Sequence, residues 1–342
     1  MTVRMKDIAK KAGVSTVTVS KALSGQRGVS EQMRSEIIRL AGEMGYVNHA
    51  AAARKERSGI SYTIGILMAN RFFDRYNSFY GNLLQLVSAE ASVMECSTML
   101  EIVSDEMERN GTVPRMLREE TVDGVIVLGS MEEEYLKVLR EREVPLMYLD
   151  FTSREERCDC VISDSFYGAS QMTDYLFRRG HRRLAYVGTV LSTTSITDRY
   201  LGYLKSMMEH QVQPLEEWII DDRDLETGMM DTDRFFRLPD PLPSAFVCNC
   251  DLAAAYLLKK LEERGLTCPD DVSVTGFDNF AYPGISEHQF TTYEVDVKEM
   301  ARKAVHNLLH KLNGEYYRRG VVIVTGRLVE RETVKTIDER HF

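Results

Sequence analysis

Residues 5–25 read MKDIAKKAGVSTVTVSKALSG. Apolar side chains recur at helical spacing over residues 5–12, which predicts a first short helix there. Gly13 can take the left-handed backbone conformation that ends a helix, and Ser15 is a good N-cap for a second helix over residues 16–23. Two short helices joined by a tight turn that contains glycine are typical of a helix-turn-helix motif.

Residues 29–46, VSEQMRSEIIRLAGEMGY, predict a third helix. Ser30 is a second N-cap, and Gly45 closes the segment. The apolar positions between them fall at helical spacing, at Met33, Ile37, Leu40, Ala41 and Met44. We therefore expect a small all-α head over residues 1–47.

The second helix of a helix-turn-helix motif enters the major groove of DNA by its N-terminal residues. Thr16 and Val17 stand at that end, and Lys21 follows one turn later, where it can reach a guanine edge. Hydroxyl side chains and free backbone N–H groups at the start of the helix suit phosphate oxygens. The predicted DNA-contacting residues of the head are Ser15, Thr16, Val17, Thr18, Ser20 and Lys21.

Charge is unevenly distributed along the chain. The 342 residues carry a formal net charge of −9, whereas residues 1–60 carry +6 and the remainder −15. A basic head on an acidic body concentrates affinity for phosphate at one end of the protein. The first residues lack the apolar core of a signal peptide, and no apolar run approaches the roughly 18 residues of a membrane helix. We therefore expect a cytoplasmic protein without a membrane partner.

From residue 62 onward, short apolar runs alternate with helical patterns. The expected strands are 64–68, 125–128, 146–149, 184–187, 245–248 and 272–274, and the expected helices include 80–89, 168–179 and 251–264. This alternation predicts an α/β body of parallel sheets covered by helices.

In open parallel sheets, ligands bind beyond the carboxyl ends of the strands. Polar and aromatic side chains follow several of the expected strands, and the candidates for a ligand site are Asn70, Phe79, Asp150, Thr193, Ser195, Arg199, Asp251 and Asp278. Carboxylates, hydroxyls, an arginine and aromatic faces suit a polyhydroxylated ligand. The alternative is that each of these residues only caps the helix that begins there.

The six cysteines include two C-x-C pairs, at Cys158 and Cys160 and at Cys248 and Cys250. Zinc sites usually present C-x₂₋₄-C from a flexible knuckle, whereas Cys248 and Cys250 lie in the run AFVCNC, which reads as a buried strand. We therefore expect reduced structural thiols, no metal and no cofactor.

The head resembles that of the LacI/GalR family of bacterial repressors. The pattern A-G-V-S-x-x-T-V-S followed by L-x-G, which runs from Ala12 to Gly25, carries the resemblance. It implies that Thr16, Val17 and Lys21 occupy the principal base-reading positions.

Family members follow the head with a short hinge helix, typically P-N-x-x-A-R-S-L, whose Leu wedges into the minor groove. Residues 48–56 read NHAAAARKE, so Asn48 and Arg54 are further predicted DNA contacts, while Lys55 or Glu56 falls at the Leu position. Neither side chain is the apolar wedge that unstacks a base step. We therefore predict DNA binding without the usual central kink.

The resemblance covers nearly the whole chain, through segments such as IGILM, TVDGVIVLG, PLMYLD, GHRRLAYVG, DRYLGY and DDVSVTGFD. It implies a hinge over residues 48–61 and a periplasmic-binding-protein-like core over 62–342. One lobe would comprise about 62–160 and 291–320, and the other about 161–290 and 321–342. It also implies effector contacts by Asp150, Thr193, Ser195, Arg199 and Asp251, with Phe79 against the ligand ring. The chain departs from the family in a longer loop after the first strand, over residues 71–76, and in Cys250, which replaces an Asn.

The sequence thus predicts a homodimeric, sequence-specific transcriptional repressor of carbohydrate-utilisation genes. Its partners would be double-stranded operator DNA and a small-molecule effector, a sugar by first choice. The alternatives are a regulator that responds to a nucleobase or nucleoside, and a binding protein without a DNA role. An enzyme is not expected, because the chain has no G-x-S-x-G, P-loop, H-E-x-x-H or G-x-G-x-x-G motif.

Overall fold

The computed structural model describes residues 5–23, 29–44, 61–73, 78–142, 144–154, 158–225, 227–231, 233–282 and 289–337. Within these ranges no helix combines the length and the apolar character needed to cross a membrane.

Three helices form the head, as predicted: α1 (Met5–Ala12), α2 (Thr16–Leu23) and α3 (Glu31–Glu43). Gly13 has a φ of +67°, which a side chain would strain, and so ends α1. The Ser15 hydroxyl accepts a hydrogen bond from the Thr18 amide (3.0 Å) and caps α2. Ile8 and Val19 are fully buried between the helices, together with Ile37, Leu40 and Ala41.

Arg34 of α3 ties that helix to α2. Its Nη1 donates to the carbonyl oxygens of Lys21 (3.2 Å) and Ala22 (2.9 Å), in the last turn of α2. The last carbonyls of a helix lack partners within the helix, and a cation there complements the helix dipole.

We expect Arg34→Gln to weaken operator binding by about 1–2 kcal/mol, because α2 loses charge-assisted hydrogen bonds that fix its orientation. The measurement is a titration of labelled operator at fixed salt. Arg39→Gln is the matched control, since Arg39 makes an exposed ion pair with Glu36 on the same helix (2.6 Å). Equal losses in the two variants would show that only the positive charge matters.

The first sheet belongs to the lobe that follows the head. Its strand order is β11-β5-β4-β3-β1-β2, and all neighbouring strands are parallel. The bounds are β1 (Thr63–Ala69), β2 (Ser97–Val103), β3 (Gly124–Leu128), β4 (Leu146–Leu149), β5 (Cys160–Ser163) and β11 (Val321–Val324). The accompanying helices are η1 (Asn70–Phe72), α5 (Phe79–Val93), α6 (Asp105–Arg109), α7 (Arg115–Arg118), α8 (Glu133–Arg140) and α12 (Val297–Leu312).

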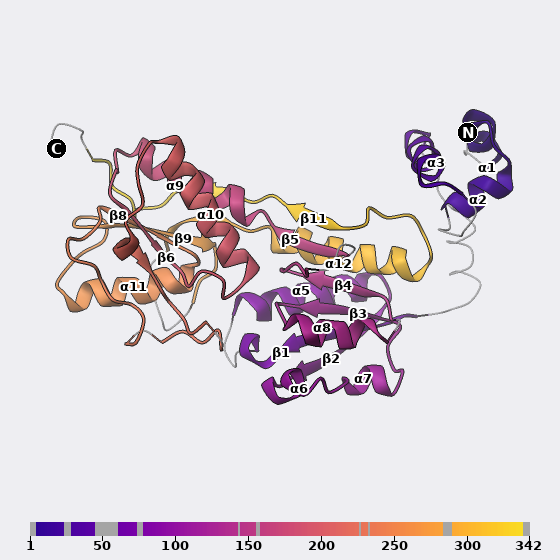
Figure 1. Cartoon of the computed structure of the whole chain (residues 1–342), viewed down its shortest axis with the longest axis horizontal. Helices are drawn as coiled ribbons and strands as arrows, with labels where there is room; N and C mark the ends of the chain where they lie inside the picture. The colour runs from indigo at the N-terminus through magenta and orange to yellow at the C-terminus, as the bar shows by residue number, and fades with distance from the viewer. Residues whose placement is uncertain are drawn as a thin grey trace.

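The second sheet forms the other lobe, with strand order β12-β10-β9-β8-β6-β7. Its strands are parallel apart from β12, which runs antiparallel to β10. The bounds are β6 (Leu184–Val187), β7 (Ile219–Ile220), β8 (Ala245–Cys248), β9 (Ser273–Asp278), β10 (Thr291–Glu294) and β12 (Arg327–Val329). The helices are α9 (Ser165–Arg178), α10 (Thr194–Glu209), η2 (Glu216–Trp218) and α11 (Asp251–Glu263). Figure 1 shows the two lobes side by side, with α12 lying along the first sheet.

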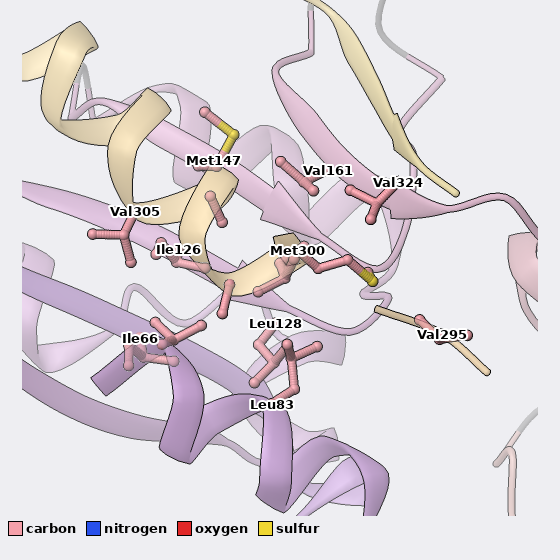
Figure 2. Close-up of a cluster of buried hydrophobic side chains, with 14 of the residues drawn as sticks. Ile66, Leu83, Ile126, Leu128, Met147, Val161, Val295, Met300, Val305 and Val324 are labelled. Carbon is pink, nitrogen blue, oxygen red and sulfur yellow. The ribbon is translucent and has the colours of Figure 1, made fainter. Parts of the chain in front are cut away.

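The apolar runs are continuous because the strands are buried on both faces. In β3, Ile126 and Leu128 pack into the cluster on the side of α5 and α12, whereas Val125 and Val127 pack on the side of α8. Figure 2 shows the first of these clusters, in which Leu83 and Met300 surround strand residues that include Ile126.

The lobe boundaries expected from the sequence need correction, because each crossing comes one strand later. Strands β5 and β11 lie in the first sheet and β10 lies in the second, so the chain crosses near residues 164, 295 and 325. The reason is long-range pairing: Val321 of β11 lies beside Cys160 of β5, a contact that the local pattern does not reveal.

Candidate functional site

A cavity of about 470 Å³ lies between the two lobes, a size that suits a small ligand. Seven of the eight candidate residues line it: Asn70, Phe79, Asp150, Thr193, Ser195, Arg199 and Asp278. They come from both lobes, and most lie at a strand end or a helix start, where parallel sheets place their ligand sites; Arg199 lies in the second turn of α10. Asp251 is not among the lining residues; its Oδ2 accepts a hydrogen bond from the Phe280 amide (2.8 Å) at the start of α11.

Asp150 is the principal acceptor that the first lobe offers. It follows β4 with a φ of +69°, a strained conformation of the kind that gathers at functional sites. The Tyr80 hydroxyl donates to its Oδ2 (2.9 Å), while its buried Oδ1 has no hydrogen-bond partner among the residues that the structure describes. Burial raises the pKa of Asp150 to about 6, against the opposing effect of Arg199. Its free oxygen therefore favours a ligand that donates a hydrogen bond.

Arg199 on α10 is 6% exposed and fixed on several sides. Its Nη1 donates to the Asn249 carbonyl (2.6 Å), its Nη2 to Asp278 Oδ1 (3.2 Å) and its Nε to the Ser165 hydroxyl (3.3 Å). Its guanidinium carbon lies 3.9 Å from the centre of the Phe277 ring. A guanidinium held this firmly presents its remaining N–H groups in a fixed direction, which suits recognition of ligand oxygens.

The hydroxyls of Thr193 and Ser195 lie 3.1 Å apart at the start of α10. Thr193 also caps this helix, because its hydroxyl accepts from the Ile196 amide (3.1 Å). Thr193 therefore combines the capping role with a place in the cavity wall.

Aromatic rings form the wall on the side of the first lobe. Phe72 lies 4.7 Å from Tyr80 between ring centres, and Phe79 contacts Tyr80 edge to face at 5.4 Å. Phe72 and Phe73 belong to the lengthened loop, and both line the cavity; residues 74–76 of that loop lie outside the described ranges. The loop therefore adds an apolar surface on which a ring can pack.

Sequence reasoning missed Arg223, which lines the cavity after β7. Its Nε and Nη2 donate to the two oxygens of Asp222 (2.9 and 2.6 Å). Asp222 is fully buried and also accepts from the amide nitrogen of the Asn249 side chain (2.7 Å). Burial alone would raise the pKa of Asp222, but Arg223 and these hydrogen bonds hold it below its ordinary value. The signal that could have found Arg223 is its place shortly after the carboxyl end of β7, which is only two residues long.

Cys250 also lines the cavity, and its Sγ accepts from the Ala253 amide (3.4 Å) as the N-cap of α11. None of the six cysteines, which all lie within the described residues, forms a disulfide bond, and burial raises the pKa of Cys250 to about 12. In the described part of the chain, no three His, Cys, Asp or Glu side chains gather in a way that would hold a metal ion.

In the head, Thr16, Val17 and Lys21 are exposed on α2, with Val17 61% accessible. An exposed β-branched residue at the start of this helix is available for contact with a thymine methyl group. The Ser15 and Thr18 hydroxyls lie 2.9 Å apart beside it. The Ser20 side chain, Asn48, Arg54 and the predicted hinge fall outside what the structure describes.

Two protein families match the chain. Residues 4–48 match the family described as "Bacterial regulatory proteins, lacI family", and residues 173–334 match the "Periplasmic binding protein-like domain". The HTH-type transcriptional repressor PurR of Vibrio atlanticus (strain LGP32) is 27% identical over 337 residues, which cover 98% of this chain and 99% of that protein.

Solved structures share the fold over nearly the full length. A complex of the transcriptional regulator CelR with cellobiose has a TM-score of 0.67 at 23% identity and covers 97% of this chain and 99% of its own. The lac repressor dimer bound to operator and the anti-inducer ONPF has a TM-score of 0.68 at 22% identity, with coverage of 98% and 100%. The predicted fold, a helix-turn-helix head on a two-lobed α/β core, is thereby confirmed.

Proposed function

Since the chain belongs to the LacI family of bacterial regulatory proteins, we propose that it is a sequence-specific transcriptional repressor whose affinity for operator DNA is set by a small molecule. The head reads the operator, with Thr16, Val17 and Lys21 as the base-contacting residues. The effector binds between the lobes and changes how they are arranged. The similar proteins reported above are described as transcriptional repressors or regulators.

One observation carries the proposal for the effector. The cavity between the lobes combines a carboxylate oxygen of Asp150, which has no partner within the described ranges, with fixed guanidinium donors and a wall of aromatic rings. A sugar meets each of these features, because its hydroxyls both donate and accept while one ring face is apolar. We therefore propose a sugar as the effector and genes of carbohydrate use as the targets.

A nucleobase or nucleoside is the second candidate. The relatives named PurR and the rings of Phe72, Phe79, Tyr80 and Tyr282 at the cavity favour it. A flat base would stack on a ring, whereas a sugar relies on hydrogen bonds around its edge. The two candidates are separated by supplying sugars and nucleosides in parallel.

The proposed regulation is a coupling between two sites in a homodimer. Effector binding would favour one arrangement of the lobes, which shifts the spacing of the two heads on a pseudo-palindromic operator. Such coupling is reciprocal, so operator DNA must change the affinity for the effector by the same factor as the effector changes the affinity for DNA.

The test of the function is affinity selection of sheared DNA from the source genome by the purified protein at fixed salt, followed by sequencing. Recovery of a pseudo-palindrome with half-sites about one helical turn apart supports a dimeric operator-binding protein. The selection is run without a small molecule, with pooled sugars and with pooled nucleosides. If no DNA sequence is enriched under any of the three conditions, the proposal is contradicted.

Lys21→Ala tests the assignment of base reading. We expect it to weaken binding to the selected operator by about 1–3 kcal/mol and to relax the sequence preference at one position of each half-site. The measurement compares affinities across single-base operator variants. If affinity falls equally for every sequence, Lys21 contacts phosphate and not a base.

A further inference from the structure

Two arginines reach the cavity from the second lobe, and one residue joins them. The Asn249 backbone oxygen accepts from Arg199 Nη1 (2.6 Å), and its side-chain oxygen accepts from Arg223 Nη2 (3.2 Å). Asn249 directly follows β8, so both guanidinium groups are anchored at the same edge of the sheet. Arg223 Nη1 makes no hydrogen bond within the described part of the chain, which leaves a donor at the cavity wall.

The positive charges at the cavity are already neutralised. Each lining arginine has its own carboxylate partner: Arg71 with Glu108 (2.6 Å), Arg199 with Asp278 (3.2 Å) and Arg223 with Asp222 (2.6 Å). Asp150 instead has only the Tyr80 hydroxyl as a hydrogen-bond partner within the described residues. Among the described residues, the three guanidinium groups of the cavity are therefore matched by three carboxylate partners, and Asp150 adds a fourth carboxylate at the wall.

An added negative charge has no guanidinium left to neutralise it in such a site. A phosphate or carboxylate would also face Asp150, and like charges brought together out of water are strongly disfavoured. A neutral hydroxyl avoids this cost, because its oxygen accepts from a guanidinium and its hydrogen is donated to a carboxylate.

We propose that Arg223 is a second specificity-determining arginine of the effector site, and that the site accepts an uncharged sugar while rejecting its phosphorylated and carboxylated forms. This inference rests on the proposed function and deepens it. Arg223 donates to a ligand oxygen through Nη1, while Asp222 and Asn249 fix the orientation of its guanidinium plane. Asp150 accepts a hydrogen bond from a ligand hydroxyl on the opposite side.

The experiment is calorimetric titration of the full-length protein with neutral hexoses, pentoses and disaccharides, each beside its phosphate or uronate counterpart. We expect at least one neutral sugar to bind, and its charged counterparts to bind at least about tenfold more weakly. Asp150→Asn should bring the two affinities to within about threefold of each other, since it removes the uncompensated charge.

The role of Arg223 is tested in the double variant Asp222→Asn/Arg223→Gln, which removes the guanidinium group together with its carboxylate partner and so leaves no buried charge. We expect it to lose about tenfold in affinity for the neutral sugar. Arg115→Gln is the control, because Arg115 forms an exposed pair with Glu119 on the first lobe.

Three results would each overturn the inference. Charged sugars could bind as tightly as neutral ones, no neutral sugar of the panel could bind, or the double variant could keep full affinity for the neutral sugar. Operator binding by the same preparation is measured in parallel. If the protein binds operator DNA but no neutral sugar is preferred, only the proposed class of effector is wrong. If no operator is bound in any selection, the result counts against the proposed function itself.

Discussion

The Asp222→Asn variant is expected to lower the free energy of unfolding by about 3–5 kcal/mol, because it leaves the Arg223 guanidinium buried without its carboxylate. Asp222 is fully buried, and the Arg223 side chain is 14% exposed. The carboxylate also accepts from the Thr189 amide (3.0 Å), after β6, and from the Asn249 side chain (2.7 Å), after β8, so its loss disturbs the ends of two strands of the second sheet. Urea unfolding followed by circular dichroism at pH 7 measures the effect.

The double variant Asp222→Asn/Arg223→Gln separates charge from packing. Removing both charges should restore most of the lost stability, since a neutral pair has no uncompensated charge to bury. If the double variant has the same free energy of unfolding as Asp222→Asn, the stabilisation comes instead from the hydrogen bonds of the carboxylate.

The same pair predicts a dependence on pH. The pKa of Asp222 lies below its ordinary value of 3.8 in the folded protein, so the folded state binds this proton less readily than the unfolded chain. The stability that Asp222 contributes is therefore present above pH 3.8 and is lost as the pH falls through the folded pKa. The difference between parent and variant should shrink as the solution is made more acidic.

The sequence was informative where burial leaves a local pattern. Buried on both faces, β3 and β4 read as unbroken apolar runs, and the cap residues Ser15 and Ser30 marked the helix starts of the head. The edge strand β2 was missed because most of its side chains are exposed, and the resulting mixed sequence does not stand out. Pairing between β5 and β11 joins segments about 160 residues apart, and no local pattern encodes it.

The candidate site shows the same division. The strand-end rule predicted the positions of Asp150, Arg199 and Asp278, because the carboxyl ends of parallel strands meet at one edge. It passed over Asn249, one residue after β8, in favour of Asp251, which lies behind the wall. The distinction between them depends on the direction of each side chain and not on spacing, so only the structure resolves it.

Asp150→Asn is expected to stabilise the protein at pH 7 while weakening effector binding. Burial raises the pKa of Asp150 from 3.8 to about 6, which corresponds to about 3 kcal/mol of unfavourable free energy for the ionised form in the folded state. Asparagine keeps the size of the side chain and removes the charge. The same substitution raises the free energy of unfolding and removes the carboxylate that accepts from the ligand. This is expected where a residue is needed for binding although it destabilises the folded protein.

The sign of the pH dependence distinguishes this explanation from a change in packing. Between pH 3.8 and about 6 the folded protein binds the Asp150 proton and the unfolded chain does not, so this residue's contribution to stability falls as the pH rises through that window. The variant's advantage should therefore be largest at pH 7 and close to zero at pH 4. Asp270→Asn, at an exposed carboxyl group, serves as the control. An advantage of equal size at both pH values would mean that ionisation of Asp150 is not its cause.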